Sequence, residues 1–90
     1  MIDECMINSY QVMTLKSTVD EILNNNNKAM FYGDPFDYTT KDIDEVIEYF
    51  ENTEEYEKCG ELLNEKKAKE MAEFDIFLHG LAETNGITNY

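Results

Sequence analysis

Residues 40–71 read TKDIDEVIEYFENTEEYEKCGELLNEKKAKEM, and this stretch decides the predicted fold. From Ile43 to Phe50 the apolar residues recur at i, i+3, i+4 and i+7, which is the spacing of one helix face. A second helix is predicted from Thr53. Its expected buried residues are Tyr56, Cys59, Leu62 and Leu63. Because so few residues connect the two helices, we expect them to fold back on each other as an αα-hairpin.

Helix-capping patterns place the starts of both hairpin helices. Thr39 with Asp42 precedes the first helix in the arrangement of an N-terminal capping box, and Asn52 with Glu55 repeats the pattern before the second. Gly60 lies inside the second helix, where glycine costs about 1 kcal/mol relative to alanine. A close crossing with another helix would explain a glycine there.

Residues 9–23 allow two interpretations. Apolar residues at 12, 15, 19 and 22 have helical spacing, and this favours one helix from Ser9, as N-cap, to Leu23. Alternatively, residues 10–15 form a short strand and a helix begins only at residue 17 or 18. Thr18 and Glu21 would then form a capping box.

Residues 53–83 also leave two possibilities open. The apolar spacing returns after the polar segment 64–69 at Met71, Phe74, Leu78 and Leu81, but on a different face of the helix. We therefore expect a bend or a short break near residues 66–70, with one long helix as the alternative. Residues 74–78 are expected to pack inside the molecule. Their apolar and acidic pattern is also typical of segments that dock in a groove of a partner.

Residues 28–40 are the irregular segment, marked by Gly33 and Pro35, and are rich in aromatic residues. We expect this loop to lie over the core as a lid, with a binding platform as the alternative. Its large side chains are Met30, Phe31, Tyr32, Phe36 and Tyr38. The prediction is a single all-α domain over residues 1–90. It is a small bundle of three to four helices around the hairpin at about 40–70.

The charge of the chain is strongly negative. Twenty acidic residues stand against seven lysines, and the net charge of −13 lies beyond the magnitude of about 2–8 that suits a small domain. Such a chain repels phosphate backbones and anionic lipid and attracts basic surfaces. Direct binding to nucleic acid or to a membrane is therefore disfavoured.

The acidic residues are concentrated in the hairpin. Residues 42–61 contain nine acids and one lysine. We expect two rows of acids on the outer faces of the two helices, which form a continuous surface that no lysine of the chain neutralises. The first row is Asp44, Glu48, Glu51 and Glu55, and the second is Glu54, Glu57, Glu61 and Glu65. The ordinary alternative is a solvated helix face. The candidate partner-binding residues are Asp44, Glu48, Glu51, Glu54, Glu55, Glu57, Glu61, Tyr49 and Tyr56.

The sequence has no recognisable catalytic or metal-binding motif. The acids around residues 34–44 do not fit the calcium-loop pattern. Cys5, Cys59 and His79 are too few and too far apart for a zinc site, and the cysteines are interpreted as reduced. His79 is interpreted as a residue at the core boundary. We expect no enzyme activity, no metal and no cofactor.

Small, strongly acidic chains without arginine resemble, as a class, the DNA-mimic and inhibitor proteins of phages, in size and charge. The resemblance implies a non-catalytic protein that binds a basic, nucleic-acid-binding surface of another protein and inhibits or modulates it. The two cysteines, interpreted as reduced, favour a cytoplasmic location, which would be the host cytoplasm if the chain is phage-encoded. The alternative is a structural or adaptor module that self-associates, or docks on a larger complex, through apolar contacts.

Overall fold

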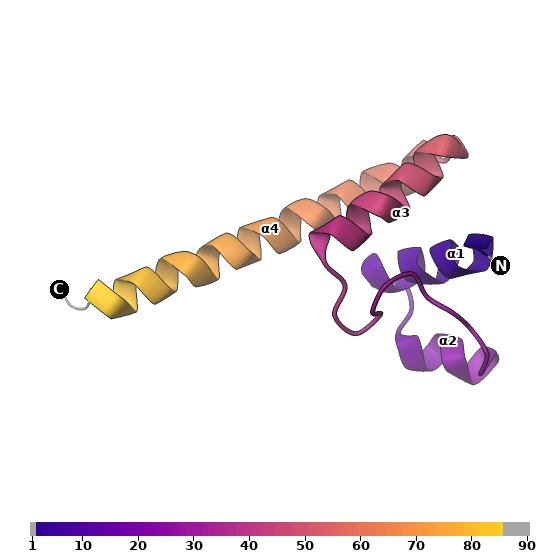
Figure 1. Cartoon of the computed structure of the whole chain (residues 1–90), viewed down its shortest axis with the longest axis horizontal. Coiled ribbons are helices and arrows are strands. Elements are labelled where there is room, and N and C mark those ends of the chain that lie inside the picture. Colours follow the sequence, from indigo (N-terminus) through magenta and orange to yellow (C-terminus); the bar gives the residue numbers. More distant parts are fainter. Residues whose placement is uncertain (1, 86–90) are drawn as a thin grey trace.

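The described part of the chain consists of four helices joined by turns and one longer loop (Figure 1). The computed structural model describes the backbone of residues 2–85 and the side chains of residues 4–74. The helices are α1 (Ile2–Met13), α2 (Val19–Asn25), α3 (Thr40–Asn52) and α4 (Tyr56–Asn85). The predicted all-α bundle with a central hairpin is confirmed.

α3 and α4 form the hairpin and run side by side (Figure 1). The predicted capping box at the start of α3 is present: the Asp42 amide donates to Thr39 Oγ1 at 3.1 Å, and the Thr39 amide donates to Asp42 Oδ2 at 2.9 Å. The second predicted cap is wrong, because α3 continues to Asn52 and Thr53 is its C-cap. α4 therefore begins at Tyr56, three residues later than predicted.

The core lies where α1 crosses the hairpin. Phe50 is fully buried at its centre, with the rings of Tyr10 and Tyr49 packed edge-on against it at centroid distances of 5.7 and 5.0 Å. Burial of these apolar side chains is the main force that holds the three helices together. The buried cluster consists of Met6, Tyr10, Met13, Ile43, Val46, Phe50 and Leu62.

The preferred interpretation of residues 9–23 as one helix is wrong. α1 begins at Ile2, and Ser9 is a buried residue in its middle rather than an N-cap. α2 begins at Val19 with the capping box of Thr18 and Glu21 that the alternative predicted. The strand of that alternative is wrong as well, because residues 10–13 belong to α1.

A residue in the left-handed backbone conformation ends α1, and it explains why the prediction of one helix over residues 9–23 is wrong. Leu15 has φ +62°, and the Leu15 and Lys16 amides donate to the Val12 and Gln11 carbonyls at 3.1 and 2.9 Å. This is the Schellman arrangement, in which glycine is the usual left-handed residue. Leucine rarely adopts this conformation, so its place in the apolar spacing concealed the helix end. The Leu15 side chain is 80% exposed instead of buried.

α3 ends in the same way. Glu54 has φ +61°, and the Glu54 and Glu55 amides donate to the Glu51 and Phe50 carbonyls at 3.0 and 2.8 Å. The second left-handed position is thus occupied by an acidic residue, which lacks the conformational freedom of glycine because it has a Cβ. Glu54 lies in the turn that connects the two helices of the hairpin.

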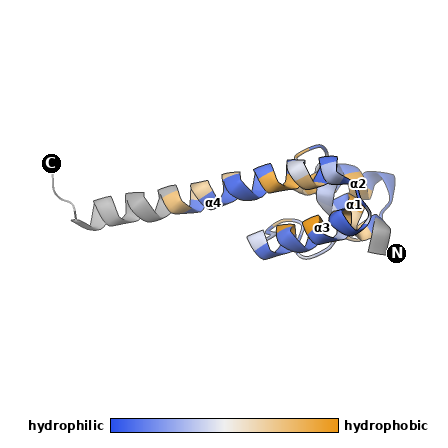
Figure 2. Cartoon of the chain, turned by 90° about the horizontal axis from the view of Figure 1, so that it is seen from above, coloured by the Kyte–Doolittle hydropathy of each residue, from blue (hydrophilic) through white to orange (hydrophobic). Residues whose placement is uncertain are grey.

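α4 is one continuous helix of 30 residues that runs nearly straight (Figure 1), so the predicted bend or break near residues 66–70 is wrong. The apolar face changes for another reason: α4 runs antiparallel to α3 and continues past the start of α3, and Figure 2 shows apolar residues on α4 beyond that point. Met71 is 69% and Phe74 60% exposed, so the expectation that Phe74 packs inside is also wrong. The side chains of residues 75–78 and of His79 lie outside the described residues.

Two further expectations for α4 are corrected. Tyr56 is 65% exposed and Leu63 is exposed, while Leu62 is buried and Cys59 is partly buried as predicted. No neighbouring atom lies within 4 Å of the position that a Gly60 Cβ would occupy, so no helix crosses there. Although α4 is long, no helix between residues 2 and 85 is apolar enough to cross a lipid bilayer.

The aromatic loop covers the core only in part. Tyr32 and Tyr38 pack against the buried cluster, whereas Met30 and Phe36 are exposed. Gly33 has φ +74°, and a Cβ there would lie 2.9 Å from Asp42 Oδ2, the atom that caps α3. Glycine is therefore required where the loop passes the start of α3.

We predict that Leu15→Gly stabilises the protein by about 0.5–1 kcal/mol, because glycine adopts the left-handed conformation without the steric cost that leucine carries. The exposed Leu15 side chain contributes little packing that could be lost. Urea unfolding of both proteins measures the difference. Ser17→Gly is the control, since Ser17 has no positive φ, and it should destabilise. A less stable Leu15→Gly variant would contradict the assignment of the helix end.

Candidate acidic interface

Four of the predicted partner-binding acids are exposed around the turn of the hairpin. Glu48 and Glu51 lie one turn apart on α3, Glu54 lies in the turn, and Glu57 lies in the first turn of α4. Within the described side chains, no lysine lies within the ion-pair distance of 4.0 Å of these four residues. We call Glu48, Glu51, Glu54 and Glu57 the acidic turn.

Three other predicted acids are neutralised within the chain. Their ion pairs are Asp44 with Lys66 at 2.8 Å, Glu55 with Lys58 at 2.7 Å, and Glu61 with Lys16 at 2.9 Å. The prediction of a continuous surface without lysine partners is therefore wrong for these acids. Two of the lysines are distant in sequence from the acid they pair with, and only the fold brings them together.

The predicted rows are also shorter than expected. α3 ends at Asn52, so Glu55 does not continue the row that Asp44, Glu48 and Glu51 begin. Glu54 lies in the turn and is not part of a helical row with Glu57. The acids therefore gather around the turn of the hairpin instead of following its two outer faces.

Glu61 belongs to a cluster that fastens α1 to α4. The Tyr10 hydroxyl donates a hydrogen bond to the Glu61 carboxylate, and Lys16 pairs with the same carboxylate. The hydrogen bond from Tyr10, together with Lys16, lowers the pKa of Glu61. Burial and the Glu61 carboxylate raise the pKa of Tyr10 to about 12. This cluster is structural, so the Glu61 carboxylate already has partners within the chain.

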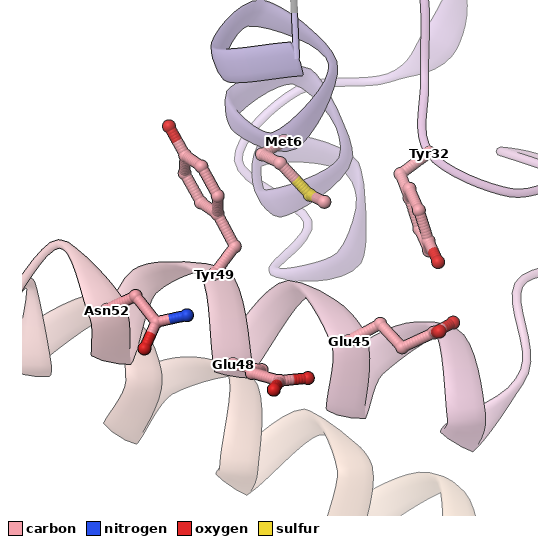
Figure 3. Close-up of a pocket in the computed structure, with 6 residues that line it drawn as sticks. All are labelled: Met6, Tyr32, Glu45, Glu48, Tyr49 and Asn52. Carbon is pink, nitrogen blue, oxygen red and sulfur yellow. The ribbon is translucent and has the colours of Figure 1, made fainter.

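An open hollow of about 280 Å³ lies beside the acidic turn (Figure 3). It is lined by residues of α1, α3 and the aromatic loop. Glu45 and Glu48 extend from α3 toward Tyr32, while Tyr49 and Asn52 lie on the other side and Met6 comes from α1. Glu48 thus belongs to both the hollow and the acidic turn. The hollow is smaller than pockets for drug-sized ligands, and its size suits a single side chain.

The two tyrosines that line the hollow are held in place by contacts with neighbouring residues. The Tyr32 amide donates to Ser9 Oγ at 2.7 Å, and Ser9 Oγ donates to the Tyr32 carbonyl at 3.3 Å. A hydrogen bond with Glu45 is the main cause that raises the pKa of Tyr32. Tyr49 is fixed by its edge-on contact with Phe50. The Tyr32 and Tyr49 rings are therefore placed by the fold before any partner binds.

The two predicted aromatic anchors differ in position. Tyr49 is partly buried and lines the hollow, while Tyr56 is largely exposed at the start of α4. Carboxylates next to aromatic rings form an environment for a lysine or arginine side chain, because the rings attract cations and the carboxylates pair with them. Among the described residues, no group of three or more His, Cys, Asp or Glu could hold a metal ion, and Cys5 and Cys59 are free.

The predicted partner-binding residues include Glu48 and Tyr49 of the hollow, but sequence reasoning missed its other four lining residues. Glu45, Glu48 and Asn52 follow the spacing i, i+3 and i+7 on α3, which indicates a shared helix face. That spacing was available from the sequence. The contributions of Met6 and Tyr32 were not, because they depend on how α1 and the loop cross α3.

We predict that Tyr10→Phe lowers the free energy of unfolding at pH 7 by about 1–3 kcal/mol, because Glu61 loses a hydrogen bond to its charged carboxylate. The hydroxyl of Tyr10 has a pKa raised from 10.0 to about 12 in the fold, so its stabilising effect is complete below pH 10. It is lost as the pH rises toward 12. Urea unfolding between pH 7 and about 11 measures it for both proteins.

The difference in unfolding free energy between the two proteins should shrink above pH 10. Tyr32 and Tyr38 are present in both proteins, so their ionisation affects both equally and does not contribute to this difference. A difference that is constant with pH would contradict the proposed bond between Tyr10 and Glu61.

We predict that Ser9→Ala destabilises the protein by about 1–3 kcal/mol, since the Tyr32 amide and carbonyl lose their partner. Ser17→Ala is the matched control, because the Ser17 hydroxyl makes only a 3.4 Å contact with Gln11. Its effect should stay within about 0.5 kcal/mol. Thermal unfolding followed by circular dichroism compares the two variants, and equal effects would show that Ser9 does not hold the loop.

Comparison of the chain with protein-family models, curated proteins and solved structures gives no match, so the interface is interpreted from its own geometry and charge.

Proposed function

We propose that this chain is a non-catalytic binding protein that occupies a basic, nucleic-acid-binding surface of another protein and so inhibits or modulates it. A cytoplasmic location, in the host if the chain is phage-encoded, belongs to the same proposal. The acidic turn makes the first contact, and the hollow beside it receives a basic side chain of the partner.

The observation that supports the proposal most directly is the exposure of the acidic turn without lysine partners among the described side chains. Three of the seven lysines pair with Asp44, Glu55 and Glu61, whereas the four acids of the acidic turn have no lysine within 4.0 Å among the described side chains. Clustered charge of one sign accelerates association with a surface of opposite charge. A row of carboxylates also competes with phosphates for the same lysines and arginines.

Glu54 adds a second argument from its local cost. Its φ of +61° is unfavourable for a residue with a Cβ. Glycine would satisfy the turn better. Residues that violate a local rule without structural compensation are concentrated at functional sites. An acid at this position is explained if its charge is used by a partner.

The hollow supplies specificity. A lysine or arginine that enters it meets the Glu45 and Glu48 carboxylates on α3 and the Tyr32 and Tyr49 rings on either side (Figure 3). Arginine fits this arrangement best, because its planar guanidinium stacks on aromatic rings and pairs with carboxylates at the same time. The walls are already fixed by Ser9 and Phe50, so little ordering is needed on binding.

We predict that the chain displaces DNA from a basic DNA-binding protein, and that reversing the acidic turn abolishes this. The variant carries Glu48→Lys, Glu51→Lys, Glu54→Lys and Glu57→Lys. A panel of such proteins, each bound to a fluorescent duplex, is titrated with the chain at about 0.05 M and about 0.3 M salt. We expect displacement of at least one duplex, weakening with salt, and a loss of at least about tenfold in the variant.

The matched control reverses four exposed acids away from the turn and changes the net charge equally. Its substitutions are Asp20→Lys, Asp37→Lys, Glu70→Lys and Glu73→Lys. The control should keep most of the affinity. Equal losses of affinity in both variants would show that binding depends on net charge and not on the acidic turn. Binding that does not change with salt concentration, or that persists when the acidic turn is reversed, would overturn the proposal.

A further inference from the structure

An open groove of about 300 Å³ lies where the end of α1, the start of α2 and the aromatic loop meet. The hollow beside the acidic turn reaches α1 at Met6, whereas this groove reaches α1 at Val12 and continues past its end. The groove is therefore a separate depression, toward the other end of α1. We call it the apolar groove, because its lining is mostly apolar and includes Val12, Leu15, Val19, Asp20, Pro35 and Phe36.

Two large apolar side chains at the apolar groove are exposed to solvent. Leu15 is 80% and Phe36 76% exposed, and these are the two highest values among the large apolar side chains that the structure describes. A single exposed apolar side chain is ordinary, but exposed apolar side chains that meet at one depression are typical of interaction sites. The exposure of Leu15 and Phe36 therefore marks the apolar groove as a contact surface.

Leu15 also carries a local conformational cost. Its φ of +62° is unfavourable for a residue with a Cβ, and its exposed side chain gains little burial in return. Glycine would end α1 at a lower free energy. Residues that violate a local preference without structural compensation are concentrated at functional sites. A leucine at this position is explained if a partner contacts its side chain.

Both exposed side chains are presented by turns that the fold holds in place. The Leu15 amide donates to the Val12 carbonyl at 3.1 Å, which closes the end of α1. The Phe36 amide donates to Asp34 Oδ1 at 2.9 Å, which fixes the loop beside Pro35. The backbone on both sides of the apolar groove is thus ordered before binding, and this lowers the entropic cost of a contact.

The charges around the apolar groove indicate the chemistry of its partner. Asp20 lines the groove, Asp34 and Asp37 lie on either side of the loop residues that line it, and all three are exposed. Among the described side chains, no lysine lies within 4.0 Å of these acids, and Lys16 beside Leu15 is engaged by Glu61. An acidic rim favours an apolar side chain that has basic neighbours. It disfavours an anionic lipid surface, and it disfavours a second copy of this chain, whose net charge is −13.

We propose that the apolar groove is a docking site for a partner protein, which places one large apolar side chain against Leu15 and Phe36 and basic residues beside Asp20 and Asp37. Pockets for whole drug-sized ligands begin at about this volume, so an open groove of this size suits a single side chain. The proposal does not depend on the acidic turn, which lies beside a different depression.

Titration of the full chain with a short synthetic peptide, followed by heteronuclear NMR, tests the proposal. The peptide has one leucine with two lysines on each side and uncharged ends, and it is added up to about 5 mM at about 0.15 M salt. We expect chemical-shift changes at residues 12–20 and 35–37. Replacing the leucine of the peptide by serine, or its lysines by glutamates, should weaken binding at least about fivefold. Binding that does not need the leucine, or equal binding of the glutamate peptide, would overturn the proposal.

Leu15→Gly is the decisive variant, because we expect it to stabilise the fold, so a loss of binding cannot come from unfolding. It should weaken binding of the lysine peptide at least about fivefold, and Phe36→Ser should have a similar effect. Met71→Ala is the matched control, since Met71 is 69% exposed but lies on α4, and it should leave the affinity unchanged. Full binding by Leu15→Gly would overturn the proposal.

The double variant Asp20→Asn, Asp37→Asn tests the acidic rim. It should weaken binding of the lysine peptide at least about threefold and leave binding of a peptide with serines in place of the lysines unchanged. The variant with the reversed acidic turn should keep the shift changes at the apolar groove, so this proposal and the proposed function can fail separately. Loss of these changes would place the peptide at the acidic turn. Shift changes at the groove when the chain is concentrated without peptide would identify a second copy as the occupant, and either result would overturn the proposal.

Discussion

The structure depends on the contact that Tyr10 makes with both helices of the hairpin. Its ring packs edge-on against Phe50 of α3, and its hydroxyl donates to Glu61 of α4. One side chain of α1 therefore combines apolar burial with a charge-assisted hydrogen bond. Without it, Met6 and Met13 would be the remaining described side chains of α1 in the buried cluster.

This anchoring has consequences for the acidic surface. Lys16 follows α1 and reaches Glu61 because Tyr10 fixes α1 against α4. Lys66 similarly reaches Asp44 because α4 packs alongside α3 and places the two side chains next to each other. The packing of the core thus decides which acids are neutralised. The charge that remains at Glu48, Glu51, Glu54 and Glu57 is a result of the fold as much as of the composition.

The hairpin could be predicted from the sequence because its signals are local. The spacing from Ile43 to Phe50 and the Thr39–Asp42 cap both act within a few residues, and the structure confirms both. The failures involve positions where tertiary geometry overrides local pattern. Leu15 fits the helical spacing but occupies a left-handed position, and Phe74 fits a core pattern although the described helices that could cover it end earlier.

The same distinction applies to the candidate site. The acids could be identified from the sequence, and their exposure follows from their spacing on the helices. Their pairing could not be predicted, since Lys16 and Glu61 are 45 residues apart and meet only when α1 crosses the hairpin. The hollow beside them could not be predicted for the same reason, because it needs Met6, Tyr32 and α3 together.

The continuity of α4 makes the polar segment 64–69 a spacer of defined length. Each residue of an α-helix advances the chain by about 1.5 Å and rotates it by about 100°. One inserted residue would therefore turn everything beyond the spacer by more than a quarter of a circle relative to the hairpin. Four inserted residues would nearly restore the original azimuth while moving the far end by about one helical pitch. The length of this spacer therefore determines both the rotation of the far part of α4 relative to the hairpin and its distance from the hairpin.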